Sequence, residues 1–316
     1  MQSLFCYHCN QINIMSFLNN ASKGTNLLST YILTLCLVIL AYAIVGQIPL
    51  LVDLKLHGGL ADLENEGSLN FGQLLGQNKL LTYLIIPFIV VLIALILSIK
   101  YLHKRPIISL FTSRESFDWK RFFLAALIWG FIMVVFLAIS IYSGENITWN
   151  FNASTFFPLL LISLFLIPIQ TTCEEVLFRG YLFQGFGHFY KKGIIAVVIT
   201  GLLFGLLHGA NPEVEKLGYI VLVYYIGTGF FLGIMALMDD GLELSMGYHA
   251  INNIFASLIL TNEWQAFQTD ALFMDHAKPT FGWDALLTII LIQPLLLFIF
   301  SKMYKWKNWK GKFLGE

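Results

Sequence analysis

The sequence predicts an all-α, polytopic membrane protein of about eight transmembrane helices, and three observations support this fold class. Hydrophobic residues make up 57% of the 316 residues and charged residues only 12%, whereas soluble domains carry roughly 25% charged residues. The mean hydropathy is +0.73. Apolar segments of membrane-spanning length also recur along the whole chain.

A helix needs about 20 mainly apolar residues to cross a bilayer, and eight segments meet this requirement. They are about 27–52, 80–102, 122–142, 156–188, 193–210, 217–238, 241–262 and 282–303. The fourth is longer than one crossing requires. From these segments we expect a cytoplasmic N-terminal tail (1–26), a first set of membrane helices (27–155), a helical core (156–262), and a last helix with a basic tail (263–316).

The charges between the segments predict the orientation. Basic residues gather in the second connection and the C-terminal tail, namely Lys100, Lys104, Arg105, Arg114, Lys120 and Arg121, then Lys302, Lys305, Lys307, Lys310 and Lys312. Acidic residues gather in the first, third and seventh connections. Because basic loops stay in the cytoplasm, we expect an integral protein of the plasma membrane with both termini cytoplasmic.

Two smaller features of the connections carry less information. Residues 103–121 have the length and the aromatic residues for an interfacial helix with Phe111, Phe117 and Trp119 facing lipid. Cys6 and Cys9 form a single Cys-x-x-Cys pair, which we interpret as incidental to the N-terminal tail. The zero net charge gives no indication of a nucleic-acid partner.

The fourth segment contains charges that hydrocarbon should exclude. Glu174, Glu175 and Arg179 follow a strongly apolar run, and each buried charge costs at least ~2.5–3.5 kcal/mol on insertion scales. Residues four apart share a helix face, so Glu175 and Arg179 should pair, while Glu174 points elsewhere. Glu174 is therefore the candidate base for proton transfer.

The fifth segment places Phe204 and His208 on one helix face. Glycines at 201, 205 and 209 form a stripe of small residues on a neighbouring face, which allows helices to approach closely. If the turn between the fourth and fifth segments lies near Lys191, Glu174 and His208 are each about 25 Å from it at ~1.5 Å per residue. They should therefore lie level.

The seventh segment places His249 and Asn253 on one face. Each of these polar residues taken alone is as typical of a structural hydrogen-bond network as of a site. Two acids, an arginine, two histidines and an amide that converge at one depth favour a functional site.

These residue types suit hydrolysis of a peptide bond. The sequence lacks the Gly-x-Ser-x-Gly and His-Glu-x-x-His signatures of other hydrolases. A glutamate and a histidine can activate water, while an imidazole and an amide can donate to an oxyanion. Alternatively, Glu174, His208 and His249 could hold a zinc ion. The sequence leaves both mechanisms open.

The three motifs Glu174-Glu175-x-x-x-Arg179, Phe204-x-x-x-His208 and His249-x-x-x-Asn253 resemble, in order and approximate spacing, those of the CPBP family. This family comprises type II CAAX prenyl endopeptidases and related bacteriocin-processing and self-immunity membrane proteins. The resemblance covers about residues 156–262. It implies an eight-helix intramembrane endopeptidase with a polar cavity open to the cytoplasmic leaflet.

The resemblance also implies roles for these residues. Glu174 and His208 would activate water, Glu175 and Arg179 would support that pair, and His249 and Asn253 would form the oxyanion site. The implied partners are membrane lipid and a membrane-associated protein or peptide substrate, which need not be prenylated. A non-catalytic immunity or scaffold protein of the same fold is the main alternative, and a proton-coupled transporter is a further one.

Overall fold

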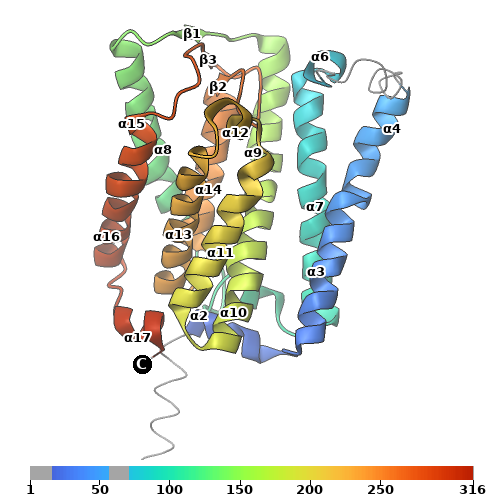
Figure 1. Cartoon of the computed structure of the whole chain (residues 1–316), viewed down its shortest axis with the longest axis vertical. Coiled ribbons are helices and arrows are strands. Elements are labelled where there is room, and N and C mark those ends of the chain that lie inside the picture. The colour runs from blue at the N-terminus through green and yellow to red at the C-terminus, as the bar shows by residue number, and fades with distance from the viewer. Residues whose placement is uncertain (1–15, 57–70, 316) are drawn as a thin grey trace, which may run out of the picture.

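The computed structural model describes residues 16–56 and 71–315 as a bundle of helices that run up and down side by side (Figure 1). Within these residues, seven helices are long and apolar enough to cross a membrane. The prediction of an all-α polytopic membrane protein is confirmed. Cys6 and Cys9 lie outside the described residues.

The first half of the chain supplies three crossings. The first is α3 (Leu28–Ala43), continued through a short 3₁₀ segment by α4 (Ile48–Leu56). This 3₁₀ segment packs closely against the second crossing at Gly46. A Cβ at this position would lie 2.5 Å from Cα of Pro87. The remaining helices of this half are α6 (Phe71–Leu75), α7 (Gln77–Tyr101) and α8 (Trp119–Tyr142).

The second half forms the core of the bundle. A helix of three parts leads into it, with α9 (Ala153–Glu175), a π-helical segment (Val176–Leu182) and α10 (Phe183–Tyr190). The helices that follow are α11 (Gly193–Leu207), α12 (Pro212–Leu217), α13 (Val221–Asp239), α14 (Glu243–Ile254), α15 (Trp283–Leu287), α16 (Gln293–Met303) and α17 (Trp309–Leu314).

The predicted span at 241–262 is shorter than expected. It consists of the 12 residues of α14 and a π-helical segment, Phe255–Ile259, and it is not among the seven long apolar helices. It lies against α8, α9 and α13, and every residue from Glu243 to Ala250 is buried. A helix that other helices enclose needs no apolar face toward lipid, which explains its polar side chains.

A small sheet closes the end of the bundle opposite α2 and α17 (Figure 1). Its strands are β1 (Ile147–Trp149), β2 (Leu260–Asn262) and β3 (Phe273–Asp275). β3 lies in the middle, antiparallel to β1 and parallel to β2. Strands of three residues have no visible periodicity, so the sequence did not predict this sheet.

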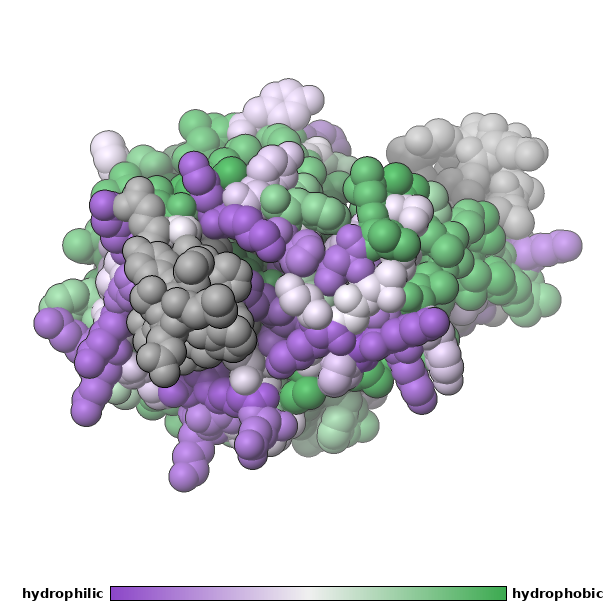
Figure 2. Space-filling model, turned by 90° about the horizontal axis from the view of Figure 1, so that it is seen from below, coloured by the Kyte–Doolittle hydropathy of each residue, from purple (hydrophilic) through white to green (hydrophobic). Residues whose placement is uncertain are grey.

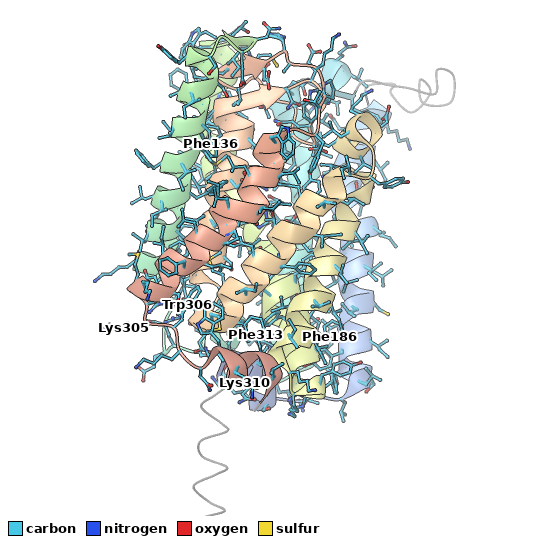
Figure 3. All side chains as sticks on the ribbon, turned by 60° about the vertical axis from the view of Figure 1, so that its left-hand side comes forward. Phe136, Phe186, Lys305, Trp306, Lys310 and Phe313 are labelled. Carbon is cyan, nitrogen blue, oxygen red and sulfur yellow. The ribbon has the colours of Figure 1, made fainter. Side chains whose placement is uncertain are left out.

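The other end of the bundle is more ordered than the sequence predicted. The expected N-terminal tail, 1–26, includes the short helix α2 (Ser16–Asn19), in which Phe17 and Leu18 are buried, and it packs against α10. In the basic tail, Lys312 Nζ donates to Asp240 Oδ2 at 2.6 Å and to Leu237 O at 3.1 Å. Figure 3 shows Trp306, Lys310 and Phe313 at this end.

The prediction of an interfacial helix at 103–121 is wrong. Before α8 begins at Trp119, this connection contains a 3₁₀ turn, Ile107–Leu110. Phe111 and Phe117 pack against the buried core. Of the three predicted lipid-facing aromatics, Trp119 alone is exposed. The segment folds inward because its polar groups find partners there.

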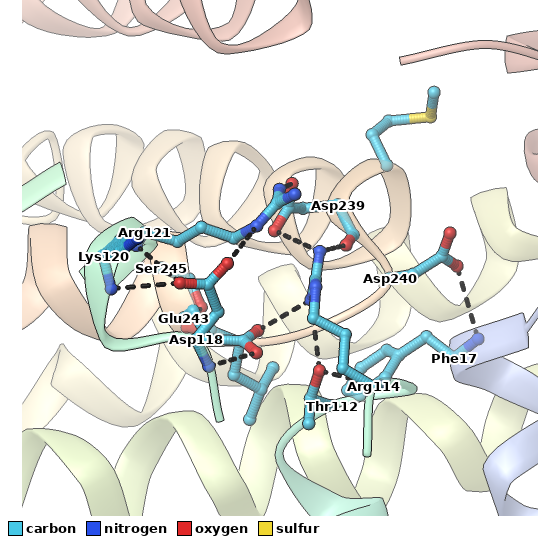
Figure 4. Close-up of polar contacts among 12 residues, drawn as sticks. Phe17, Thr112, Arg114, Asp118, Lys120, Arg121, Asp239, Asp240, Glu243 and Ser245 are labelled. Atoms are coloured by element: carbon cyan, nitrogen blue, oxygen red, sulfur yellow. Dashed lines mark hydrogen bonds and ion pairs between the residues drawn. The ribbon is translucent and has the colours of Figure 1, made fainter. Parts of the chain in front are cut away.

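Those partners are acids at the turn between α13 and α14 (Figure 4). Arg114 donates to Asp239 Oδ2 and to Glu243 Oε2, each at 3.1 Å, and Arg121 also pairs with Asp239. Glu243 Oε1 accepts from the backbone of Asp118 at 3.2 Å. These contacts fix the start of α14 and hence the height of its polar residues.

The glycine stripe on α11 is tight at two positions and open at the third. A Cβ on Gly205 would lie 2.7 Å from the backbone nitrogen of Ile226, whereas nothing lies within 4 Å of a Cβ on Gly209.

Gly205→Ala should therefore lower the free energy of unfolding by about 1–3 kcal/mol through overpacking. Gly209→Ala is the matched control and should change it little. Equal thermal unfolding midpoints of the two variants in detergent would contradict this packing.

Candidate functional site

The three predicted polar motifs meet at the junction of four helices. Glu174 and Glu175 end α9, Arg179 lies in the π-helical segment, His208 follows α11 directly, and His249 and Asn253 lie on α14. The fourth helix, α13, contributes a backbone carbonyl and an aromatic side chain. Within this group, hydrogen bonds join residues of α9 to residues of α14.

Glu175 and Arg179 form the predicted ion pair. Arg179 Nη1 donates to Glu175 Oε1 at 2.9 Å, and both side chains are 0% exposed. Arg179 Nη2 also donates to Gly229 O of α13 at 3.3 Å, and its Cζ lies 4.1 Å from the ring centroid of Phe204. The pair is therefore neutral as a unit and connects α9 to α11 and α13.

His249 lies between the two glutamates. Its Nδ1 is 2.9 Å from Glu175 Oε1, and its Nε2 is 3.5 Å from Glu174 Oε2. Because an ionised carboxylate only accepts hydrogen bonds, the contact with Glu175 fixes a hydrogen on Nδ1 and the orientation of the ring. His249 Nε2 then faces Glu174.

Glu174 is held by a residue that the sequence reasoning missed. Gln170, one helical turn earlier, donates from Nε2 to Glu174 Oε1 at 2.6 Å. Its own carbonyl accepts from Asn253 Nδ2 at 3.1 Å, which fixes the orientation of the amide. The spacing of four residues was a signal for this contact, but only the position of Asn253 on another helix shows that Gln170 is fixed.

A second row of hydrogen bonds supports Asn253. Asn252 Nδ2 donates to Asn253 Oδ1 at 3.2 Å, and Asn252 Oδ1 accepts from the indole of Trp129 on α8 at 3.1 Å. The chain Trp129, Asn252, Asn253, Gln170, Glu174 thus runs across three helices. It leaves the Glu174 side chain 13% exposed.

His208 is near this group but does not bond to Glu174. Its Nδ1 lies 2.7 Å from Phe204 O, and its ring stacks on Tyr225 of α13 with centroids 4.2 Å apart. The rings of Phe204 and His208 are 4.7 Å apart, which confirms their shared face. The histidine in contact with Glu174 is His249, and the expectation that Glu174 and His208 lie level stays a prediction.

A π-helical segment, Val176–Leu182, separates Glu174 from the turn at Lys191. A π-helical turn holds extra residues in the same rise. Gly180 in this segment packs on the preceding loop, since a Cβ there would lie 2.6 Å from Leu110 O. Such segments are frequent at functional sites.

The donor groups do not form a ready zinc site. Among residues 16–56 and 71–315, no three His, Cys, Asp or Glu side chains are placed to hold one metal ion. The three predicted ligands keep His249 Nε2, Glu174 Oε2 and His208 Nε2, because the other nitrogen of each histidine and Oε1 of Glu174 already have partners.

Comparison with known proteins gives two matches. Residues 153–255 match the family model described as type II CAAX prenyl endopeptidase Rce1-like, a range that contains all six predicted site residues. The uncharacterized protein YyaK of Bacillus subtilis (strain 168) is 29% identical over 218 residues, which cover 68% of this chain and 71% of that protein. No solved structure matches.

The enclosed ion pair should dominate the stability of the site. Arg179→Met leaves Glu175 buried without its cation, and breaking a buried pair in this way costs about 3–5 kcal/mol. The exposed pair Lys216–Glu215, 3.3 Å apart, supplies the control Lys216→Met, for which we expect less than about 0.5 kcal/mol. Denaturant unfolding in detergent measures both, and equal losses would show that Glu175 and Arg179 do not depend on each other.

Proposed function

We propose, from the premise that residues 153–255 form a domain of the Rce1-like type II CAAX prenyl endopeptidase family, that this protein is an intramembrane endopeptidase. Its substrate would be a membrane-associated protein or peptide. The observation that supports this most strongly is the different treatment of two adjacent carboxylates. Glu175 is paired with Arg179 and fully buried, whereas Glu174 is oriented by Gln170 and its side chain is partly exposed.

In the proposed mechanism Glu174 removes a proton from a water molecule, which attacks the carbonyl carbon of the peptide bond. Collapse of the tetrahedral intermediate then breaks the C–N bond, and Glu174 gives the proton to the departing amine. Gln170 holds Oε1 of Glu174, so Oε2 is the oxygen that accepts the proton. His208, with Nδ1 directed to Phe204 O, presents Nε2 as the second contact for the water. Proton transfer by a positioned side chain contributes typically 10²–10⁴-fold to a rate.

The oxyanion would be stabilised from α14. Asn253 uses one amide hydrogen on Gln170 and keeps a second for the oxyanion. His249 protonated on both nitrogens would donate from Nδ1 to Glu175 and from Nε2 to the oxyanion. Its charge would also balance that of Glu174, because Glu175 and Arg179 already neutralise each other. Donors fixed before the reaction stabilise developing charge most effectively.

We propose that both ends of the chain lie in the cytoplasm and that the membrane is the plasma membrane. The described ends, α2 and α17, lie at the same end of the bundle (Figure 1), and hydrophilic side chains gather on that face (Figure 2). Green fluorescent protein fused after Glu316 should fluoresce, since it folds in the cytoplasm, and alkaline phosphatase at the same position should be inactive. The reverse pair of results would contradict this orientation.

The catalytic assignment predicts the effect of removing the base. Glu174→Gln should reduce kcat for cleavage of a membrane-anchored peptide by about 10²–10⁴-fold without changing the unfolding midpoint, and His208→Ala should also reduce it. Glu215→Gln alters an exposed glutamate and should leave the rate unchanged. An immunity or scaffold protein would show no cleavage in any of these forms, and a transporter would show Glu174-dependent flux in liposomes instead.

Gln170 should act through Glu174 and not through the substrate. A hydrogen bond to a charged group contributes about 1.5–3 kcal/mol, so Gln170→Met should lower kcat by roughly 10–100-fold and leave KM unchanged. Steady-state kinetics on folded protein separates the two constants. A rise in KM at constant kcat would show instead that Gln170 contacts the substrate.

A further inference from the structure

Two buried side chains fix the C-terminal tail to the bundle. Trp306 is buried, and its indole Nε1 donates to Asp239 Oδ1 at 3.0 Å. Further along the tail, Lys312 is also buried, and it donates to Asp240 Oδ2 at 2.6 Å and to two carbonyl groups at the end of α13. The segment between these two anchors therefore has a defined position.

Other lysines of this tail point away from the bundle. Lys302, Lys305 and Lys307 are exposed, and the last two lie on either side of buried Trp306 in the sequence. Figure 3 shows Lys305 at the outer edge of this end of the bundle, with Trp306 closer to the helices. The backbone between α16 and α17 thus directs the indole inward and the neighbouring ammonium groups outward.

The acidic side chains that hold the tail are paired with other cations. Asp239 forms ion pairs with Arg114 and Arg121, and Asp240 forms one with Lys312. None of these cations is one of the exposed lysines. Within the part of the chain that the structure describes, the outer face of the tail therefore keeps an excess of positive charge.

The helix before the tail places these lysines at the membrane surface. α16 ends one of the seven long apolar helices, and its Phe298 and Met303 side chains are exposed, as expected of side chains that face lipid. Lys305 and Lys307 lie two and four residues beyond its end, at the level of the headgroups. Trp309 is also exposed, and tryptophan is enriched at this level. The excess positive charge therefore faces the headgroups.

We propose that Lys305 and Lys307 bind the headgroups of anionic phospholipids. Basic residues clustered next to a membrane crossing attract anionic lipid, and a negatively charged headgroup is the partner that these lysines lack within the protein. Because Trp306 and Lys312 already fix the tail, binding does not have to order a flexible segment, which favours affinity. Bound lipid stabilises the tail that holds the turn between α13 and α14 through Asp239.

Native mass spectrometry of the full chain in detergent tests this surface. The probes are phosphatidylglycerol, which is anionic, and phosphatidylcholine, which carries a phosphate but no net charge. The control for Lys305→Gln/Lys307→Gln is Lys216→Gln/Lys278→Gln, which removes an equal charge from exposed lysines of α12 and of the segment after β3. Wild type and control should retain phosphatidylglycerol in preference to phosphatidylcholine. The tail variant should bind phosphatidylglycerol about 30-fold more weakly, the loss expected for two surface lysines.

Two further measurements separate lost binding from lost folding. The substituted lysines are exposed, so both double variants should have the thermal midpoint of wild type when no lipid is added. Lys305→Arg/Lys307→Arg keeps the charge and should retain phosphatidylglycerol. Equal retention by wild type and the tail variant, an equal loss in the control, or no preference of wild type for phosphatidylglycerol would overturn the proposal. The measurement requires no peptidase activity, so its outcome is independent of the proposed function.

Discussion

The enclosed pair of Glu175 and Arg179 is the interaction on which the rest of the core depends. Two charges that leave water together are tolerated only with good geometry and further hydrogen bonds, and here those bonds come from neighbouring helices. Glu175 Oε1 receives both Arg179 and His249, and Arg179 reaches Gly229 O and the Phe204 ring. Helices α9, α11, α13 and α14 are thereby held in one arrangement around a single neutral unit.

This arrangement separates the properties of two adjacent carboxylates. Glu175 is completely buried and orients His249, while Glu174, about 100° round the helix, accepts a hydrogen bond from Gln170 and stays 13% exposed. Because the ion pair is neutral as a unit, His249, with Nε2 3.5 Å from Glu174 Oε2, is the basic side chain in direct contact with Glu174 among the described residues. The same division places the proposed base beside donors on α14, where the peptide bond would be cleaved.

The spacing of residues along single helices predicted much of the core. Contacts between different helices could not be predicted in this way. The Glu175–Arg179 pair, the shared face of Phe204 and His208, and that of His249 and Asn253 all follow from a spacing of four. The role of Gln170 depends on Asn253, which lies 83 residues away. Depth counted along the helices placed Glu174 and His208 level, but it could not show that His249 Nε2 lies 3.5 Å from Glu174 Oε2. The inner helix α14 and the three-residue strands were hard to predict because their stability comes from tertiary contacts.

The most direct test is mass spectrometry of the products formed when purified wild-type protein in liposomes is incubated with a set of membrane-anchored peptides and a metal chelator. The geometry of Glu174, Gln170 and His249 predicts cleavage at a single peptide bond that persists in the chelator and disappears in Glu174→Gln. Absence of cleavage by wild type, or undiminished cleavage by Glu174→Gln, would contradict the assignment of Glu174 as the catalytic base. Loss of cleavage in chelator with recovery on adding zinc would contradict the metal-free mechanism.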